Sequence, residues 1–427
     1  MSPHLSKRGK QTIPLLERTG EYTEPPVYFP SLGRHPRDDD LVNLATAENW
    51  LLRDKLVPKF QKYISTNFTT SDLSYVSGLG GAPQLLQGLA DFFNTYFGPL
   101  TQVDPSQIVT GPGASHLLES VLYHLCDPDE AVLIQTPYWP GFDDALTLRD
   151  DFVATHVNVQ FDGVGADPFE PDIVNAYQFA LNSSPTKVRA IIVCNPQNPL
   201  GRCYSVEALE ALLLFAEEND LQVLVDELYG LSVFSPVDTF HSVLSIDLNK
   251  LGVVHRGKDM NSSGIRLGIL ITQANSVLRD SVAAQQQSKL SSFTSVAATQ
   301  LLQDTPFLSE IVASNTVLLR SNFYVALSFL HFHRVPFILP TAGVFVFANF
   351  LAITGRPLTE EEESKLEGEF RDQGVRINGG NHFHSISPGY FRLIFAVERE
   401  KLVTGLHRIE ETLGLNGWTD TKGGDSI

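Results

Sequence analysis

The chain has 427 residues, of which 43% are apolar and 19% are charged. This balance is typical of a globular protein and excludes both a disordered chain and a small scaffold held together by disulfides. The 31 Lys and Arg residues and the 49 Asp and Glu residues give a formal net charge of −18. A surface this acidic repels phosphate backbones and anionic lipids, so we expect neither nucleic acid nor a membrane as a partner.

The cysteines and the start of the chain indicate the compartment. Cys126, Cys194 and Cys203 are an odd number of cysteines and have no metal-ligand spacing. No apolar run approaches the roughly 20 residues of a membrane-spanning helix. The charged first residues are not followed by the apolar stretch that a secretory signal needs. We therefore expect a cytoplasmic protein without a metal site.

Hydrophobic periodicity predicts the organisation of the first two thirds. Residues 1–40 are rich in Pro, Gly and charged residues and indicate an extended arm. Helical spacing begins near Asn49 and returns at Pro83–Phe97, where most apolar side chains share one stripe. Short β-rich runs then alternate with helical segments such as Ser205–Asn219; the runs are Ala131–Gln135, Ala190–Cys194, Leu221–Val225 and Gly252–His255. This alternation predicts an α/β fold with a mainly parallel sheet covered by helices on both faces.

The last third predicts a smaller α+β domain. Its expected elements are a long helix around Ser309–His333, a strand within Gly343–Phe350, an acidic helix near Thr359–Asp372 and a strand within Phe391–Val397. We assign residues 1–55 to an N-terminal arm with a segment of the small domain. Residues 56–308 are assigned to a large domain that binds the cofactor discussed below, and residues 309–427 to the C-terminal small domain.

Polar residues follow four of the predicted strands. The segments after the strands are NPQNPLG (195–201), DELY (226–229), HRGKD (255–259) and TPYWPGF (136–142), and GIRLG (264–268) comes soon after the third. Ligands bind at the carboxyl ends of parallel strands. We therefore expect these segments to meet in one site.

The chemistry of these residues matches pyridoxal 5′-phosphate (PLP). This cofactor needs an amine for a Schiff base, an anion that keeps its ring nitrogen protonated, and donors that hold its phenolate oxygen. We assign Lys258 to the Schiff base and Asp226 to the ring nitrogen. Asn198 and Tyr229 are assigned to the phenolate oxygen, and Trp139 to stacking on the ring. Three of them have a structural alternative: Lys258 could be a surface lysine, Asp226 a helix cap, and Trp139 part of the core.

The phosphate of PLP needs backbone N–H groups and a positive charge. The turn Gly111–Ser115 enters a predicted helix, so Ala114 and Ser115 are expected to contact the phosphate at the helix N-terminus. Arg266 adds a charge and a fork of donors. Ser115 could equally cap the helix, and Arg266 could form a surface ion pair.

The order of these motifs resembles a known family. NPxNPxG, then D-E-x-Y, then K-D followed by G-x-R-x-G resembles the fold-type I PLP-dependent enzymes of the class I/II aminotransferase family, over about residues 41–413. Three further stretches resemble the fungal branch of proteins similar to 1-aminocyclopropane-1-carboxylate (ACC) synthase. These are Ala47-Glu48-Asn49, Pro137–Asp143 (PYWPGFD) and Pro388–Arg392 (PGYFR).

The resemblance implies further roles. Arg392 is expected to hold the α-carboxylate of an amino-acid substrate, and Glu48 to lie near the distal part of that substrate. Tyr75 resembles the tyrosine that reaches the phosphate in the neighbouring subunit, which implies a homodimer with sites at its interface.

The chain also departs from the family pattern. The family usually has S-x-S-K before the cofactor lysine, whereas this chain has His255-Arg256-Gly257-Lys258. His255 could replace the lost hydroxyl as a phosphate contact, it could serve packing alone, or the cofactor could be held more weakly. Val76 and Ser77 replace a Gly-Asp pair that fungal relatives often have, which suggests a changed substrate pocket.

These residues predict an enzyme in which Lys258 removes the Cα proton of a small amino-acid substrate, with Asp226 and Tyr229 completing the catalytic set. The resemblance implies an ACC synthase-like lyase that acts by β- or γ-elimination, including carbon–sulfur bond cleavage, on a sulfur-bearing amino acid or conjugate in fungal secondary metabolism. One alternative is an aminotransferase that passes nitrogen to a 2-oxo acid. Another is a binding module that has lost its cofactor.

Overall fold

A computed structural model describes residues 41–75, 78–147, 152–163, 167–236, 238–247 and 263–420. The predicted arm 1–40 and the predicted strand 252–255 lie outside the described residues, as do Val76, Ser77, His255 and Lys258. Within the described ranges, no helix combines the length and the apolar character that crossing a bilayer requires.

Four parallel strands form the central sheet in the order β4-β3-β5-β6. They are β3 (Ala131–Thr136), β4 (Val153–Asn158), β5 (Val188–Cys194) and β6 (Gln222–Asp226). An antiparallel pair joins β2 (Ile108–Gly111) to β7 (Gly268–Ile271). The prediction of an α/β fold with a mainly parallel sheet is confirmed.

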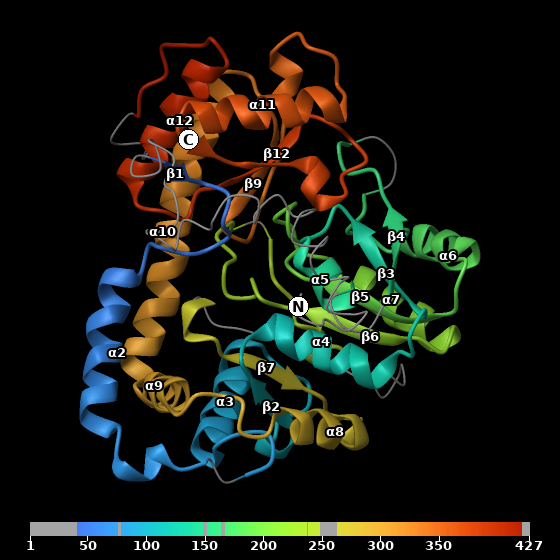
Figure 1. The fold of residues 1–427 in the computed structure, drawn as a ribbon, viewed down its shortest axis with the longest axis vertical. Coiled ribbons are helices and arrows are strands. Elements are labelled where there is room, and N and C mark those ends of the chain that lie inside the picture. Colours follow the sequence, from blue (N-terminus) through green and yellow to red (C-terminus); the bar gives the residue numbers. More distant parts are fainter. Residues whose placement is uncertain are drawn as a thin grey trace, which may run out of the picture.

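Helices cover both faces of the central sheet, as predicted (Figure 1). Ile192 and Leu224 pack on one face with α4 (Ala114–Leu125), α5 (Gly141–Thr147) and α8 (Ser276–Gln286). Their chain neighbours Ile191 and Val223 pack on the other face with α6 (Ile173–Ser183) and α7 (Val206–Glu218). Because successive residues of a strand point to opposite faces, a strand buried on both sides needs a continuous apolar run. This explains why these strands could be recognised from the sequence.

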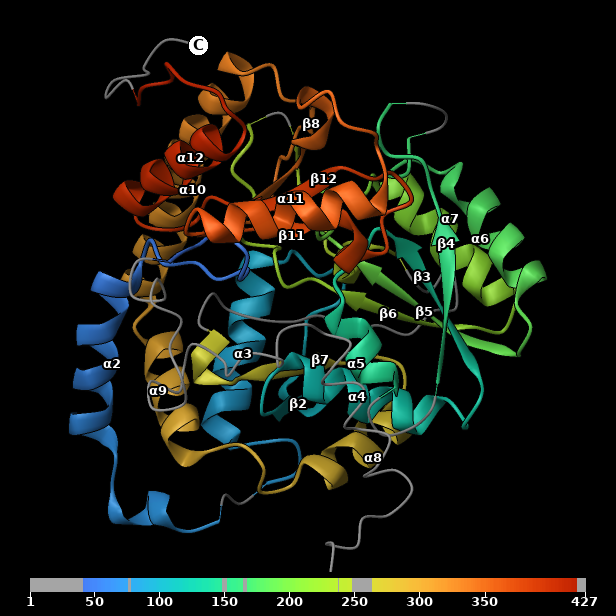
Figure 2. The same cartoon turned by 45° about the horizontal axis from the view of Figure 1, so that its top comes forward.

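A second, antiparallel sheet lies above the first in Figures 1 and 2, in the order β11-β12-β9-β8. Its strands are β8 (Phe337–Ile338), β9 (Phe345–Asn349), β11 (Asn378–Gly379) and β12 (Tyr390–Ile394). Strand β1 (Val42–Asn43) pairs in parallel with β10 (Val375–Arg376), so the start of the described chain joins this part of the molecule. Helices α11 (Glu360–Asp372) and α12 (Arg399–Thr412) complete it. We call residues 41–51 with 319–418 the smaller unit and the remaining described residues the larger unit.

Helix α10 (Thr305–Phe332) belongs to both units. Its first turns contribute Phe307 and Ile311 to a core with α2 (Arg53–Asn67), α3 (Pro83–Tyr96) and α9 (Ser292–Gln303). Its second half contributes Leu319 and Phe329 to the core of the smaller unit. The expected domain boundary between residues 308 and 309 thus falls inside this helix. Short 3₁₀ helices complete the elements: η2 (Thr70–Leu73), η3 (Pro105–Gln107), η4 (Val243–Ser245), η6 (Ser263–Ile265), η7 (Leu351–Ile353) and η8 (Gly380–Phe383).

Candidate active site

A cavity of about 280 Å³ lies at the carboxyl ends of β5 and β6 and is lined by residues of both units. Tyr75 is not among them, and 90% of its surface is exposed. Lys258 cannot be placed, because it lies outside the described residues. The cavity brings together the other predicted site residues: Glu48, Ala114, Ser115, Trp139, Asn198, Asp226, Tyr229, Arg266 and Arg392.

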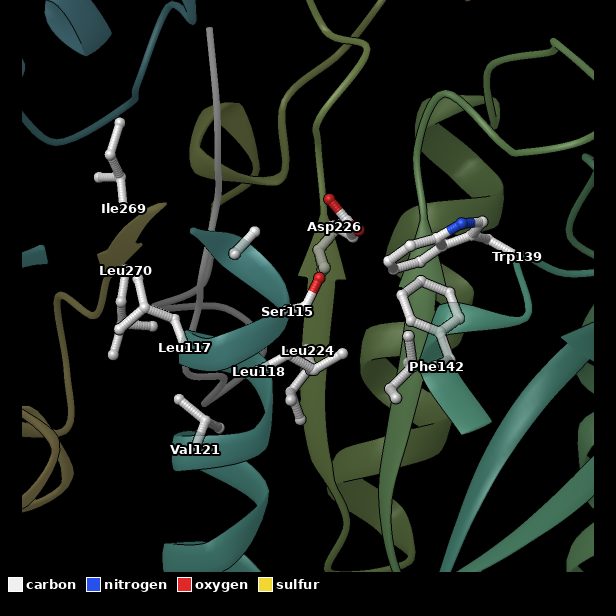
Figure 3. Close-up of a pocket in the computed structure, with 13 residues that line it drawn as sticks. Ser115, Leu117, Leu118, Val121, Trp139, Phe142, Leu224, Asp226, Ile269 and Leu270 are labelled. Atoms are coloured by element: carbon white, nitrogen blue, oxygen red, sulfur yellow. The ribbon is translucent and has the colours of Figure 1, made fainter. Parts of the chain in front are cut away.

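Asp226 is the last residue of β6 and lies at the centre of the cavity wall. In Figure 3 it lies between Ser115, at the start of α4, and Trp139. Its Oδ1 accepts the backbone N–H of Leu228 over 3.2 Å, which holds the carboxylate in place. Beneath it, apolar side chains line a smaller hollow of about 50 Å³, among them Leu117, Leu118, Val121, Leu224 and Leu270. An apolar floor lowers the local dielectric constant and strengthens the attraction between this carboxylate and a cation.

Glu227, the next residue, has a structural task. It is fully buried. Its carboxylate accepts the hydroxyl of Ser242 and the backbone N–H of Val243, each over 2.7 Å. Burial raises the pKa of Glu227 to about 8 against the effect of these hydrogen bonds. Glu227 therefore anchors the segment 242–245 next to the strand end that carries Asp226.

Arg392 and Asn198 connect the two units across the cavity. Arg392 lies on β12 and is only 4% exposed. Its Nη1 donates to Oδ1 of Asn198 over 2.9 Å, and its Nη2 donates to the carbonyl oxygen of Ala45 over 2.6 Å. The guanidinium carbon lies 4.6 Å from the ring centroid of Phe383 and 5.5 Å from that of Phe345. A buried guanidinium that faces a cavity is suited to bind a carboxylate through two parallel hydrogen bonds.

Arg266 lies against the turn that begins α4. Its guanidinium occupies the space that a Cβ atom on Gly113 would fill, and Gly113 has a φ of +93°. Nη2 of Arg266 donates to the carbonyl oxygen of Pro112 over 3.4 Å. The first N–H groups of a helix have no partners within it and carry a partial positive charge. Arg266 and the start of α4 therefore lie together at the place where the sequence analysis expects an anion.

Trp139 lies over a glycine. A Cβ atom on Gly141 would overlap the six-membered ring of its indole, so only glycine allows this close approach. Phe142 supports the indole edge to face, with 5.5 Å between the ring centroids. The spacing W-P-G-F therefore fixes the indole at the cavity wall, opposite Ser115 (Figure 3).

Glu48 lies at the edge of the cavity and forms an ion pair. Its Oε2 lies 2.7 Å from Nη2 of Arg53, whose guanidinium in turn lies 3.5 Å from the ring centroid of Trp50. Tyr229 is 6% exposed and contacts Phe345 edge to face, with 5.2 Å between centroids. The ion pair with Arg53 thus fixes the position of Glu48 at the cavity, and the ring contact with Phe345 fixes that of Tyr229.

Among the polar lining residues that were not predicted are Arg376 and Asn378. Asn378 is the Cα partner of Arg392 in the β11–β12 ladder, and Ile377 between the two polar residues is buried in the core. Their alternation follows the period of a strand, but β10 and β11 have only two residues each, which is too short for a sequence signal.

A cluster behind Trp139 was also missed. Tyr138 Oη donates to Oδ1 of Asp143 over 2.6 Å and lies 3.1 Å from Nε2 of His156. Nε2 of His384 lies 2.6 Å from Oδ2 of Asp143, and its ring stacks on Tyr138 with 4.6 Å between centroids. Tyr138 and Asp143 belong to the PYWPGFD motif, whereas His156 and His384 come from distant parts of the chain and carry no local signal.

The comparisons with known proteins show the family of this chain. The family model for aminotransferases of class I and II matches residues 39–409. The chain belongs to this family. It is 41% identical to "Probable aminotransferase gliI" of Aspergillus fumigatus over 395 residues, which cover 88% of this chain and 91% of that protein. It is 33% identical to a mouse "Probable inactive 1-aminocyclopropane-1-carboxylate synthase-like protein 2", covering 86% of this chain and 65% of that protein.

The fold is shared with solved aminotransferases. A structure of Thermus thermophilus aspartate aminotransferase matches with a TM-score of 0.74 at 20% identity, covering 96% of this chain and 100% of that one. Fold-type I and the ACC synthase-like relationship are thus confirmed. Enzymes of this family are PLP-dependent and typically form homodimers that act on amino acids.

This chain is therefore a PLP-dependent enzyme, and the alternative of a module without a cofactor is not supported. The cavity fits PLP, because a carboxylate, an amide, a phenol and an indole line it together with Arg266, whose guanidinium lies where a Cβ on Gly113 would be.

Proposed function

We propose that the cavity residues hold PLP in the manner expected from the sequence. Asp226 supplies the negative charge for the ring nitrogen, Trp139 stacks on the ring, and Asn198 and Tyr229 hold the phenolate oxygen. Arg266 binds the phosphate together with Ala114 and Ser115 at the start of α4. Lys258 forms the covalent link. Support comes from the placement of all the described members of this set in one cavity.

We infer that Arg392 grips the α-carboxylate of the substrate. It is the buried guanidinium of the cavity wall, and Asn198 orients it through a 2.9 Å hydrogen bond. Glu48 lies at the edge of the same cavity and would face the distal part of the substrate. Two fixed contacts on one carboxylate set the direction in which the Cα–H bond points, which is the geometric requirement for proton removal.

When bound, PLP acts as an electron sink that makes the Cα–H bond of an attached amino acid acidic. Lys258 would accept the Cα proton at its Nζ as a general base. Asp226, whose carboxylate lies above the apolar hollow, would balance the positive charge of the ring nitrogen that it faces. Trp139 and Phe142 close the other side and keep water from the reacting carbon.

The proposed reaction is a lyase-type elimination on a sulfur-bearing amino acid or conjugate, in fungal secondary metabolism. For a cysteine conjugate, water enters and a thiol, pyruvate and ammonia leave. Its support is the set of ACC synthase-like stretches together with the relatives of that name. Aminotransfer to a 2-oxo acid is the second candidate, favoured by the names of the fungal relatives. We place the enzyme in the cytoplasm as a homodimer in which Tyr75 reaches the partner's site.

The observation that carries the proposal is that Arg392 and Asn198 are hydrogen-bonded within the cavity that Asp226 also lines. The decisive experiment incubates the PLP-loaded enzyme with S-benzyl-L-cysteine, S-adenosylmethionine and common amino acids, with and without 2-oxo acids, and identifies products by mass spectrometry. Release of a thiol with pyruvate, or of methylthioadenosine, without a 2-oxo acid supports elimination. Product formation that requires a 2-oxo acid supports aminotransfer instead.

The role of Lys258 has its own test. Borohydride reduction of the loaded enzyme should attach a pyridoxyl group to Lys258, which peptide mass spectrometry detects. K258A should lose turnover and the label, whereas K289A, which changes a lysine outside the cavity, should keep both. Unchanged turnover in K258A would refute the assignment.

A further inference from the structure

The strongest feature outside the proposed machinery is the cluster of Tyr138, Asp143, His156 and His384. Asp143 lies on α5 and His156 on β4, both in the larger unit, whereas His384 follows η8 in the smaller unit. One carboxylate thus receives the Tyr138 hydroxyl on Oδ1 and the His384 imidazole on Oδ2, each over 2.6 Å. The cluster therefore forms one of the contacts between the two units.

The cluster lies next to Trp139 on the cofactor side of the proposed site and next to Arg392 on its substrate side. Tyr138 directly precedes Trp139, and its backbone N–H donates to the carbonyl oxygen of Phe383 over 2.8 Å. The ring of Phe383 lies beneath the guanidinium of Arg392, 4.6 Å from its carbon. The dipeptide Phe383–His384 consequently contacts the substrate-binding arginine with one residue and the turn of the cofactor-stacking tryptophan with the other.

The backbone supports a specific role for His384. This residue has a φ of +56°, in the left-handed region that non-glycine residues rarely adopt. Holding an imidazole there costs free energy that the surrounding contacts must offset. The stacking on Tyr138, with an interplanar angle of 28°, and the hydrogen bond to Asp143 are contacts that a glycine could not make.

We propose that His384 is a positioning residue: its contact with Asp143 and Tyr138 latches the substrate-binding wall of the smaller unit onto the Trp139 turn and thereby raises the affinity for amino acids. The inference rests on the proposed roles of Arg392 and Trp139. A substrate carboxylate must meet Arg392 while its α-carbon meets the cofactor side of the cavity. Only molecules in the binding arrangement can bind the substrate, so the apparent affinity rises with the fraction of molecules in that arrangement. The latch increases this fraction.

A second imidazole lies beside this contact. The ring centroids of His384 and His156 are 4.7 Å apart. Desolvation and then the charge of His384 lower the pKa of His156, whereas the charge of Asp143 raises it.

The other charged groups near this contact bind partners of their own. On the loop of His384 itself, His382 lies 3.0 Å from an oxygen of Glu367 on α11. Glu363 of α11 accepts backbone N–H groups of Asn381 and Gly389, so it holds the loop rather than the imidazole. The charged and titratable groups that contact His384 across the two units are thus Asp143, Tyr138 and His156.

The test measures substrate affinity in the PLP-loaded enzyme. The apparent Kd of S-methyl-L-cysteine is obtained from the change in cofactor absorption at neutral pH. H384Q should raise this Kd about five-fold or more, with a smaller change in kcat for a substrate that is turned over.

The matched control is H382Q, because His382 is an exposed histidine on the same loop with its own carboxylate partner. It should bind within about two-fold of the wild type. D143N should match H384Q, and the double variant should be no weaker than either single variant, since both break one contact. D143N also serves as the test if H384Q does not fold. Wild-type Kd values in H384Q, or losses that add in the double variant, would overturn the proposal.

A second readout does not depend on the cofactor. Hydrogen–deuterium exchange of the Tyr138 amide, which donates to Phe383, should be faster in H384Q than in H382Q. If the loaded enzyme shows no cofactor absorption and no label on Lys258, the proposed function fails, whereas the exchange measurement still decides whether the latch exists. Equal exchange in the two variants contradicts the latch.

Discussion

Gly268 packs directly on the backbone of Gly113. The two residues come from β7 and from the turn before α4, and a Cβ atom on Gly268 would lie 2.5 Å from the carbonyl oxygen of Gly113. Two residues earlier, Arg266 covers the other side of the same turn. The last glycine of the G-x-R-x-G motif therefore sets how closely Arg266 approaches the start of α4.

We expect G268A to weaken PLP binding. The added methyl group meets backbone atoms, which cannot rotate away, so the start of α4 must move relative to Arg266. The Kd for PLP, measured by fluorescence titration of the apoenzyme, should rise about ten-fold or more. G264A in the same motif is the control, because no atom of the described residues lies within 4 Å of a Cβ there, and it should bind PLP normally. Normal binding by both variants would contradict the proposed phosphate contacts of Arg266 and the start of α4.

G141A should displace the indole of Trp139. Because the overlapping partner is a ring and not a flexible chain end, the indole must leave the cavity wall. We expect altered fluorescence of Trp139 and a cofactor absorption spectrum shifted from the wild type. G368A on α11, where a Cβ meets no described atom within 4 Å, should keep both spectra and gain up to about 1 kcal/mol of stability as a helical alanine. An unchanged G141A spectrum would argue against stacking by Trp139.

Glu227 should make the protein less stable as the pH rises. Its pKa is about 8 in the folded state against a usual 4.5, so the folded state keeps the proton longer. The stability from this group is fully present below about pH 4.5 and is lost as the pH rises toward 8. The free energy of unfolding of the wild type, measured with urea, should be lower at pH 8 than at pH 5. E227Q should make this difference smaller by roughly 1–3 kcal/mol. The exposed E217Q should retain the wild-type difference.

R392K should raise KM for amino acids about 100-fold, with a smaller effect on kcat. Lysine keeps the charge but cannot donate to Asn198, to the Ala45 carbonyl and to a substrate carboxylate in one plane. Steady-state kinetics on the substrate identified by product analysis would show the effect. R53K, which changes the arginine paired with Glu48 outside the buried wall, should alter KM by less than about five-fold. An R392K enzyme with wild-type KM would remove Arg392 from the substrate site.

The central strands and their strand-end motifs could be predicted because their signals are local. The runs at 131–135, 190–194 and 221–225 are apolar on both faces, and β3, β5 and β6 agree with them within two residues at each end. The polar motifs follow directly, so their convergence in one cavity follows from parallel pairing. The stripe predicted for 83–97 is likewise buried in α3.

Long-range contacts could not be predicted in the same way. His384 and Asp143 are 241 residues apart, and nothing near either residue indicates the other. Arg376 and Asn378 lie on strands too short for a periodic signal. Glu227 is part of a recognised motif, but its task as an anchor depends on Ser242 and Val243, which reach it only through the tertiary fold.

Helix α10 joins one hydrophobic core at its start and another at its end. Its 28 residues form one uninterrupted helix. If either core unfolds, half of this helix therefore loses the packing that stabilises it. We therefore expect one cooperative heat-capacity peak in scanning calorimetry instead of two separate ones. A rod shared in this way also lets strain in either core be transmitted to the other along the helix.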